Sequence, residues 1–257
     1  MDKRTIDHWD AKLYDEKHAF VSKFGNNLID ILAPKKGEHI LDLGCGTGDL
    51  AYELHKFDVH VIGVDKSENM IKQAQAKYPF LKFVSRDAND LGYDNEFHAI
   101  FSNATLHWIK TPKQVLISMY KSLKSGGRLV AEFGGKGNVQ TITHEIIHQF
   151  KKLGIAYTPE QFPWYFPSIG EYANLMEDVG FKVTFAQHFD RPTPLEGETG
   201  LRNWIEMFAN SLIDNINTEI KELLITNVEN TLRDDMMING TWIADYKRIR
   251  IVGFKEV

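Results

Sequence analysis

Three glycines alternate within residues 41–51, which read Leu-Asp-Leu-Gly-Cys-Gly-Thr-Gly-Asp-Leu-Ala. An apolar segment typical of a buried strand precedes them, and a segment typical of a helix follows. Because glycine has no Cβ, the main chain at such a turn approaches a ligand closely. The start of the helix adds N–H donors and the positive end of the helix dipole. The stretch therefore predicts a site for a ligand with polar or anionic groups.

Three kinds of ligand compete for this turn. A phosphate-binding P-loop needs a lysine directly after its last glycine, whereas Gly48 is followed by Asp49. A dinucleotide-binding turn has the pattern Gly-x-Gly-x-x-Gly, which requires a third glycine at Asp49, and an acid at the helix start also opposes a pyrophosphate. A ligand with an amino acid at one end and adenosine at the other places no phosphate beside Asp49. The spacing favours this third ligand.

Alternating strands and helices must position the turn. Apolar and β-branched runs predict seven strands, at His39–Leu43, Val59–Asp65, Leu81–Ser85, Phe97–Ser102, Arg128–Phe133, Phe181–Phe189 and Tyr246–Phe254. Helical spacing and capping signals predict helices at 16–32, 49–57, after Ser67, and at 112–124, 141–153 and 168–179, with two more within 201–234. A glycine turn at 125–127 is predicted to close one helix, and Pro192 and Pro194 to break the chain after the sixth strand. This alternation predicts a parallel, doubly wound α/β sheet.

The length of 257 residues predicts one large domain. Its ligand-binding core is expected at about 38–134, after an N-terminal helical segment at about 1–33. The alternation of strands and helices is interrupted at about 135–167 and about 191–240, which we interpret as helical cap insertions. Both insertions are expected to cover the carboxyl ends of the strands, where sheets of this kind bind ligands.

Composition narrows the class of protein. A formal net charge of −5 argues against non-specific nucleic-acid binding, and 43% hydrophobic residues suffice for a substantial core. No apolar run is long enough to span a bilayer, and the N-terminus lacks the apolar core of a secretory signal. A single cysteine, Cys45, allows no internal disulfide and fits a reducing compartment. We therefore expect a cytoplasmic protein with neither a nucleic-acid nor a membrane partner.

Polar side chains follow the predicted strands in order. Asp65 ends the second strand, Asp87 follows the third and Asn103 follows the fourth. Together with the glycine turn, this order resembles the seven-strand, Rossmann-like S-adenosylmethionine-dependent methyltransferases over residues 38–133. The resemblance implies a mostly parallel sheet with an antiparallel last strand, and S-adenosyl-L-methionine as the cofactor.

The resemblance also implies which residues bind the cofactor. Asp65 would accept hydrogen bonds from both ribose hydroxyls, because a carboxylate suits two donors. Asp87 would accept from the adenine amine, and Asn103 would close over the methionine moiety. The implied set is Tyr14, Gly44, Cys45, Gly46, Thr47, Asp65, Lys66, Met70, Asp87, Ala88 and Asn103, with Asp42 beneath the turn. Trp9 and Tyr14 are expected to fold over the cofactor as an N-terminal gate.

Four further segments resemble the trans-aconitate methyltransferase-like group, which is also similar to the malonyl-carrier-protein methyltransferases of biotin synthesis. They are Phe-Ser-Asn-Ala-Thr-Leu-His-Trp (101–108), Phe-Gly-Gly-Lys-Gly-Asn (133–138), Pro-Trp-Tyr-Phe-Pro-Ser (163–168) and Leu-Arg-Asn-Trp (201–204). Both families esterify carboxylates of small or carrier-bound acids, so the resemblance implies O-methylation of a carboxylate. Candidate residues of the acceptor pocket are His107, Trp108, Tyr165, Arg202 and Trp204.

Methyl transfer from this cofactor requires few catalytic groups from the protein. A methyl sulfonium is already an activated electrophile, so the enzyme has to hold the acceptor in line with it and exclude water. A carboxylate acceptor needs no general base, and no residue is singled out as catalytic. N- or C-methylation of another small molecule stays open as an alternative, as does a non-catalytic module that only binds the cofactor.

One motif indicates different chemistry. His144, Glu145 and His148 fit the His-Glu-x-x-His pattern of zinc proteases, with both histidines on one helix face. The pattern is short, and it falls in an insertion of a chain whose other motifs indicate a methyltransferase. A zinc hydrolase is therefore a remote alternative, and we predict no metal site.

Overall fold

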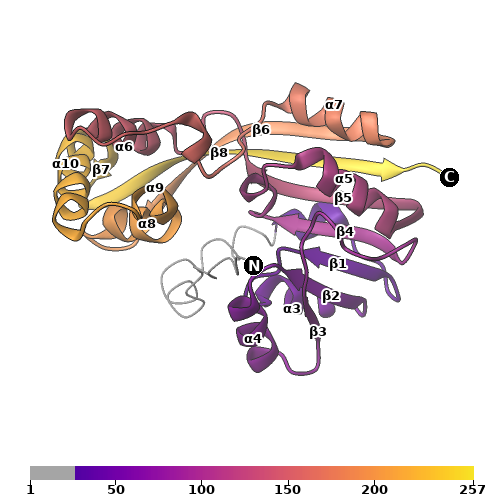
Figure 1. Ribbon diagram of the computed structural model, residues 1–257. Coiled ribbons are helices and arrows are strands. Elements are labelled where there is room, and N and C mark those ends of the chain that lie inside the picture. Colours follow the sequence, from indigo (N-terminus) through magenta and orange to yellow (C-terminus); the bar gives the residue numbers. More distant parts are fainter. Residues whose placement is uncertain (1–26) are drawn as a thin grey trace, which may run out of the picture. The chain divides into compact units, whose positions relative to one another are not determined.

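The computed structural model describes residues 27–257 (Figure 1). Its strands are β1 (His39–Leu43), β2 (His60–Asp65), β3 (Lys82–Ser85), β4 (Phe97–Asn103), β5 (Leu123–Gly134), β6 (Phe181–Leu195), β7 (Met237–Ile238) and β8 (Thr241–Lys255). Seven of them follow one another in the order β3-β2-β1-β4-β5-β8-β6, and β7 pairs with β8. Strands β1 to β5 pair in parallel, and β8 runs the opposite way. The predicted fold class, a mostly parallel α/β sheet with an antiparallel last strand, is confirmed.

Local sequence signals set the ends of several helices. The helices are α3 (Asp49–His55), α4 (Glu68–Lys77), α5 (Pro112–Ser122), α6 (Gln140–Lys152), α7 (Ile169–Val179), α8 (Gly200–Phe208), α9 (Asn210–Ile213) and α10 (Thr218–Met236), with 3-10 turns η1 (Leu106–Trp108) and η2 (Pro159–Gln161). The Ser67 hydroxyl accepts a hydrogen bond from the Met70 N–H at the start of α4. Gly180 ends α7 with φ of 114°, a left-handed conformation that residues with a side chain rarely adopt.

Three predictions of secondary structure were wrong in detail. Strand β6 continues through Pro192 and Pro194 to Leu195, because β6 is the last strand of the sheet order and an edge strand tolerates residues without an N–H. The glycine turn at 125–127 lies inside β5, where the pairing with β4 shifts between Phe97 and Ala99. The segment after residue 200 forms three helices, since the short α9 separates the two that were predicted.

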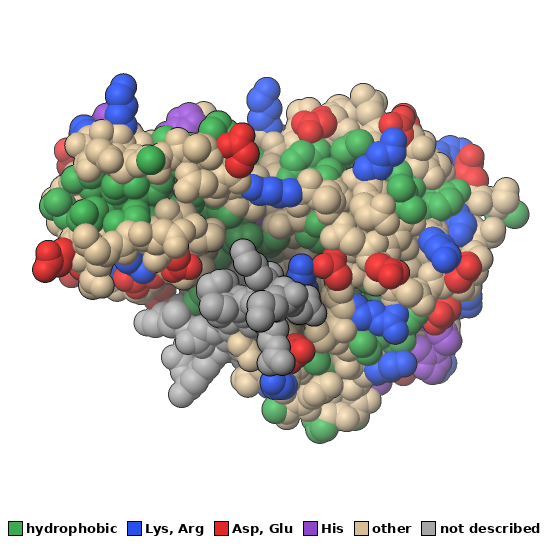
Figure 2. Space-filling view, in the orientation of Figure 1, with side chains coloured by type: hydrophobic (Ala, Val, Ile, Leu, Met, Phe, Trp, Pro, Cys, Tyr) green, Lys and Arg blue, Asp and Glu red, His purple; other side chains and the backbone are tan. Residues whose placement is uncertain are grey.

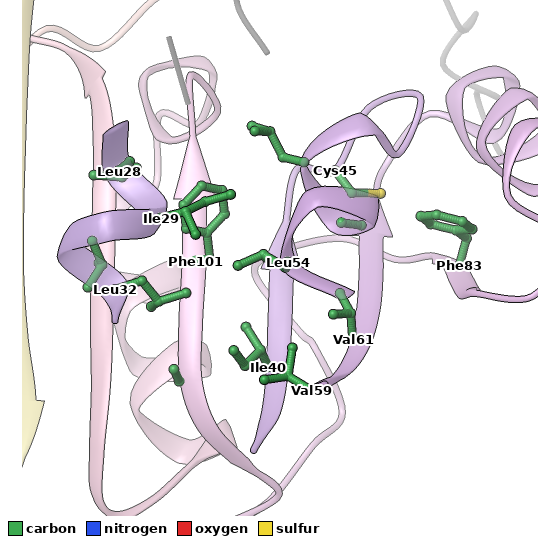
Figure 3. Packing of buried hydrophobic residues seen from close by; sticks show 14 of the residues in the cluster. Leu28, Ile29, Leu32, Ile40, Cys45, Leu54, Val59, Val61, Phe83 and Phe101 are labelled. Atoms are coloured by element: carbon green, nitrogen blue, oxygen red, sulfur yellow. The ribbon is translucent and has the colours of Figure 1, made fainter. Parts of the chain in front are cut away.

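A hydrophobic cluster fixes one face of the sheet. The side chains of Leu28 and Leu32, from the helical residues 27–32, gather with Leu54 of α3 over Ile40 and Phe101 of the strands (Figure 3). All five side chains are fully buried, at 0% exposed. This packing holds β1 and α3 in place on either side of the glycine turn.

The chain divides into two compact units. The first comprises the described residues up to Phe133, together with Pro167–Gln187 and Ile249–Val257, and the second comprises Gly134–Phe166 and His188–Arg248. Strands β6 and β8 contribute residues to both units. The second unit overlaps the two segments interpreted above as cap insertions. Trp9, Tyr14 and the start of the predicted helix 16–32 lie outside the described residues.

The surface of the first unit carries both signs of charge. On the face that Figure 2 shows, acidic and basic side chains are interspersed over this unit. None of the helices between residues 27 and 257 has both the length and the hydrophobicity that a bilayer-spanning segment requires.

Candidate functional site

The glycine turn leaves β1 with its main chain tied to β2. The Gly44 N–H donates to the Val64 carbonyl at 2.7 Å. Gly44 has φ of +75°, and a Cβ placed on it would lie 2.0 Å from the Thr105 Oγ1 atom. Gly46 has φ of +53°, and a Cβ there would have no atom within 4 Å. The first glycine is therefore required by packing, whereas the second leaves open space in which a ligand meets the main chain.

The Asp65 carboxylate is fixed beside this turn. It accepts hydrogen bonds from the Gly46 N–H at 3.0 Å and from the Ser67 N–H at 2.9 Å, one on each oxygen. Two main-chain donors, one on each oxygen, set the orientation of the carboxylate. The carboxylate is thus held in a defined orientation at the carboxyl end of β2.

Asp42 lies beneath the turn on β1. It is 1% exposed, and its Oδ2 atom has no hydrogen-bond partner among residues 27–257. Burial, and then the nearby Asp65 carboxylate, raise the pKa of Asp42 to about 8. Burial and these same two carboxylates raise the pKa of the Cys45 thiol well above its ordinary value. The thiol stays protonated at neutral pH, so Cys45 offers a ligand its main chain and no nucleophile.

The next loop places Asp87 beside Lys66. The Asp87 carboxylate binds the Lys66 Nζ at 2.9 Å and accepts from the Asn89 N–H at 2.9 Å. Partial burial alone would raise the pKa of Asp87, but the hydrogen bonds from Asn89 and Lys66 outweigh it, so that the pKa is lowered. Asp87 is therefore an ionised acceptor at neutral pH. The predicted neighbours Met70 and Ala88 are both buried, at 3% and 7% exposed.

The end of β4 is tied to its neighbours on both sides. The Ser102 hydroxyl donates to the Leu43 carbonyl at 2.9 Å, and the Ala104 N–H donates to the Glu132 carbonyl at 2.7 Å. Asn103, at 8% exposed, lies between these two contacts. The buried Glu132 carboxylate in turn binds Arg250 at 2.6 Å. These bonds fix Asn103 at the carboxyl end of β4.

Two of the predicted acceptor residues follow in η1 of the first unit. His107 is 6% exposed, and its ring lies 5.5 Å from that of Trp108. Both belong to the segment that leaves the carboxyl end of β4, as predicted from the sequence.

The other predicted acceptor residues belong to the second unit. Tyr165 is partly exposed, while Trp204 is 2% exposed and donates its Nε1–H to the Tyr246 hydroxyl at 2.6 Å. The Arg202 guanidinium binds Glu222 at 2.6 Å and Glu229 at 2.9 Å. Arg202, which was predicted to line the acceptor pocket, is thus paired with two carboxylates of α10.

Sequence reasoning missed Arg248. Its side chain is 5% exposed, and the guanidinium lies over the Tyr246 ring, 4.9 Å from the centroid. Burial raises the pKa of Tyr246, while the charge of Arg248 and the Trp204 hydrogen bond act to lower it. A signal was present in the sequence, because Trp242, Ala244, Tyr246 and Arg248 alternate along β8 and all four are buried. A charged residue on the buried face of a strand departs from the usual pattern, in which charged side chains are exposed.

The His-Glu-x-x-His motif lies on α6. The Glu145 carboxylate contacts the His148 Nδ1 atom at 3.1 Å, and hydrogen bonds from Gln149 and His148 outweigh burial and lower its pKa. Within residues 27–257, no three His, Cys, Asp or Glu side chains are grouped in a way that would hold a metal ion.

The sheet order, the open glycine turn and the carboxylates after β2 and β3 define a Rossmann-like methyltransferase. Comparison with known proteins supports this assignment. A family profile described as "Methyltransferase domain" matches residues 34–163. An uncharacterized methyltransferase of Schizosaccharomyces pombe is 33% identical over 97% of this chain and 99% of its own length. The chain belongs to this methyltransferase family, and it is an S-adenosylmethionine-dependent enzyme.

Relatives with named substrates match about half of the chain. A malonyl-[acyl-carrier protein] O-methyltransferase of Priestia megaterium is 31% identical over 60% of this chain and 58% of its own length. A trans-aconitate 2-methyltransferase of Yersinia pseudotuberculosis is 26% identical over 57% of both chains. Among solved structures, the geranyl diphosphate C-methyltransferase of Streptomyces coelicolor, in complex with S-adenosyl-L-homocysteine, has a TM-score of 0.56, with 17% identity over 99% of this chain and 87% of its own. That likeness shows a shared fold.

Proposed function

We propose that the protein transfers the methyl group of S-adenosylmethionine to a carboxylate oxygen of a small acid. The observation that carries the proposal is the Asp65 carboxylate, which Gly46 and Ser67 hold beside an open glycine turn. Two relatives, named for a malonyl carrier protein and for trans-aconitate, support an acid as the acceptor. A cytoplasmic location stays a prediction from the lone cysteine.

Each end of the cofactor has a proposed group of residues. The main chain of Gly44–Thr47 and the Asn103 side chain bind the methionine part, and the two oxygens of Asp65 accept from the ribose hydroxyls. Asp87 and the main chain at Ala88 bind the adenine, flanked by Lys66 and Met70. The hydrogen bonds already present orient the Asp65 and Asp87 side chains before a ligand arrives, which reduces the entropy lost on binding.

The chain's residues bind and orient rather than transfer protons. When bound, S-adenosylmethionine supplies a methyl group on a positively charged sulfur, ready for in-line displacement by a nucleophilic oxygen. A carboxylate acceptor is already ionised at neutral pH, so the site needs no general base. His107 and Trp108, from the segment after β4, are proposed to contact the acceptor and to exclude water.

Calorimetry with S-adenosylmethionine tests the cofactor site. We expect the wild type to bind, and Asp65→Ala to bind at least about tenfold more weakly, because two hydrogen bonds to a charged group are lost. Asp58→Ala is the matched control, since Asp58 is an exposed surface aspartate paired with Lys36. Equal affinity of Asp65→Ala and the wild type would refute the assigned role of Asp65.

A transfer screen with labelled S-adenosylmethionine tests the acceptor. The panel contains small mono-, di- and tricarboxylic acids, malonyl-carrier protein, and amines and carbon acids of similar size. We expect base-labile methyl esters, which release labelled methanol in alkali. Base-stable product from an amine or carbon acid would instead identify an N- or C-methyltransferase. Cofactor binding without transfer to any member would support a binding module.

A further inference from the structure

Thr105 is a half-buried residue of the first unit to which the proposed function assigns no role. Its hydroxyl lies 3.1 Å from the Asn103 carbonyl oxygen and 3.3 Å from the Gly44 carbonyl oxygen. Because a hydroxyl has a single proton, the two carbonyls share it as acceptors. The side chain also fills the place of a Cβ on Gly44, since such an atom would lie 2.0 Å from the Thr105 Oγ1 atom. One threonine side chain therefore joins the glycine turn to the end of β4.

Hydrogen bonds hold the Gly44 main chain from two sides. The Gly44 N–H donates to the Val64 carbonyl of β2 at 2.7 Å, and the Gly44 carbonyl accepts from the Thr105 hydroxyl. Glycine has more backbone conformations open to it than any other residue, so such a turn depends on outside bonds to stay in one of them. The Thr105 hydroxyl thus fixes the carbonyl side of a residue whose main chain is proposed to bind the methionine part of the cofactor.

The backbone on either side of Thr105 is also fixed. Ala104 has φ of +57°, a left-handed conformation that persists in a residue with a side chain only where the surrounding structure holds it. Its N–H donates to the Glu132 carbonyl at 2.7 Å, and the Thr105 carbonyl accepts from the Trp108 N–H at 2.9 Å. Left-handed residues of this kind are concentrated at functional sites. The constrained backbone gives the Thr105 side chain a defined direction, toward Gly44.

We propose that Thr105 is a positioning residue, whose hydroxyl holds the main chain of Gly44 and Asn103 in the arrangement that binds the methionine part of S-adenosylmethionine. This inference rests on the proposed function, which assigns that part of the cofactor to Gly44–Thr47 and Asn103. Bonds that exist before the ligand arrives reduce the entropy lost on binding, so their removal weakens binding. The adenosine part is assigned to Asp65 and Asp87, which other hydrogen bonds orient. Loss of the Thr105 hydroxyl should therefore affect the methionine part alone.

The test compares two ligands, S-adenosylhomocysteine and adenosine, because adenosine lacks the amino acid part. Calorimetry measures both affinities for the full-length wild type, Thr105→Val and Thr105→Ser. Valine keeps the shape of the side chain and removes the hydroxyl, whereas serine keeps the hydroxyl. Thr184→Val is the matched control, because Thr184 is exposed on β6. Thermal midpoints show whether each variant is folded, and Thr105→Ala, which also lacks the hydroxyl, replaces Thr105→Val if that variant does not fold.

We expect Thr105→Val to bind S-adenosylhomocysteine about fivefold more weakly than the wild type, as for the loss of one hydrogen bond, and to bind adenosine with unchanged affinity. Thr105→Ser should restore most of the affinity for S-adenosylhomocysteine, and Thr184→Val should match the wild type. The proposal is overturned if folded Thr105→Val binds S-adenosylhomocysteine like the wild type, if it loses affinity for both ligands equally, or if Thr105→Ser binds no better than Thr105→Val. Binding measured in this way is separate from turnover: if the affinities follow the expected pattern but no acid is methylated in the transfer screen, the proposed acceptor fails and the role of Thr105 stands.

Discussion

Asp42 should make the folded protein less stable as the pH rises. The carboxyl is 1% exposed, and burial with the nearby Asp65 raises its pKa from an ordinary 3.8 to about 8. Between these two pH values the folded protein holds a proton on Asp42 that the unfolded chain has lost. The folded state therefore becomes less stable as the pH rises through this window.

The size of the effect follows from the linkage relation. One proton bound by the folded state alone lowers the free energy of unfolding by about 1.4 kcal/mol for each pH unit. Between pH 5 and pH 7, the contribution of Asp42 should fall by about 3 kcal/mol. Asp42→Asn removes the titration and keeps the shape of the side chain. The free energy of unfolding of this variant, relative to the wild type, should rise by that amount over the same interval.

Urea denaturation of the cofactor-free protein between pH 5 and pH 8 provides the measurement. Taking the difference between wild type and variant cancels the contributions of the other titrating groups. Asp178→Asn is the control, because Asp178 pairs with Lys113 at the surface, where its side chain is 61% exposed. A difference between wild type and Asp42→Asn that stays constant from pH 5 to pH 8 would refute the reasoning.

Two further predictions concern packing around the site. Gly44→Ala should lower the free energy of unfolding by about 2 kcal/mol or more and abolish cofactor binding, because its Cβ would meet the Thr105 side chain at a positive φ. Thermal denaturation measures the stability, and calorimetry measures the binding. Gly170→Ala is the control and should be neutral, because a Cβ on Gly170 would have no atom within 4 Å. Glu132→Met should cost about 3 kcal/mol in urea denaturation, because it leaves the partly buried Arg250 without the Glu132 carboxylate. The double variant Glu132→Met/Arg250→Met should recover most of this loss. Unchanged stability of either single variant would contradict the corresponding contact.

Much of the fold was predictable because its signals are local. The apolar run of β1 is followed within a few residues by the glycine turn and α3, and Ser67 caps α4 as predicted. Strands that alternate with helices in this way pair in parallel, so their carboxyl ends share one edge of the sheet. Asp65, Asp87 and Asn103 each lie at or just after the end of one of these strands, so the sequence order and its family resemblance already indicate them as candidates.

The remaining features depend on residues that are distant in the sequence. Pro192 and Pro194 lie within β6 because that strand has an edge position, which no local pattern indicates. Arg202 was expected to serve an acceptor, but Glu222 and Glu229 of another helix bind it. Pairing of this kind follows from the packing of α8 and α10, and the spacing of charges along one segment does not reveal it.

The sequence alone determined the order of strands and helices along the chain and the glycine turn, because each follows from periodicity or from a short motif, and its resemblance to a known family indicated the type of cofactor. Only the tertiary structure decided what the charged groups do. It joins Asp65 to Gly46, nineteen residues away, raises the pKa of Asp42 by burial, and places Arg248 over Tyr246. The physical reason is that hydration and electrostatic interaction depend on the distance and burial of every neighbouring group, and these are set only when the chain has folded.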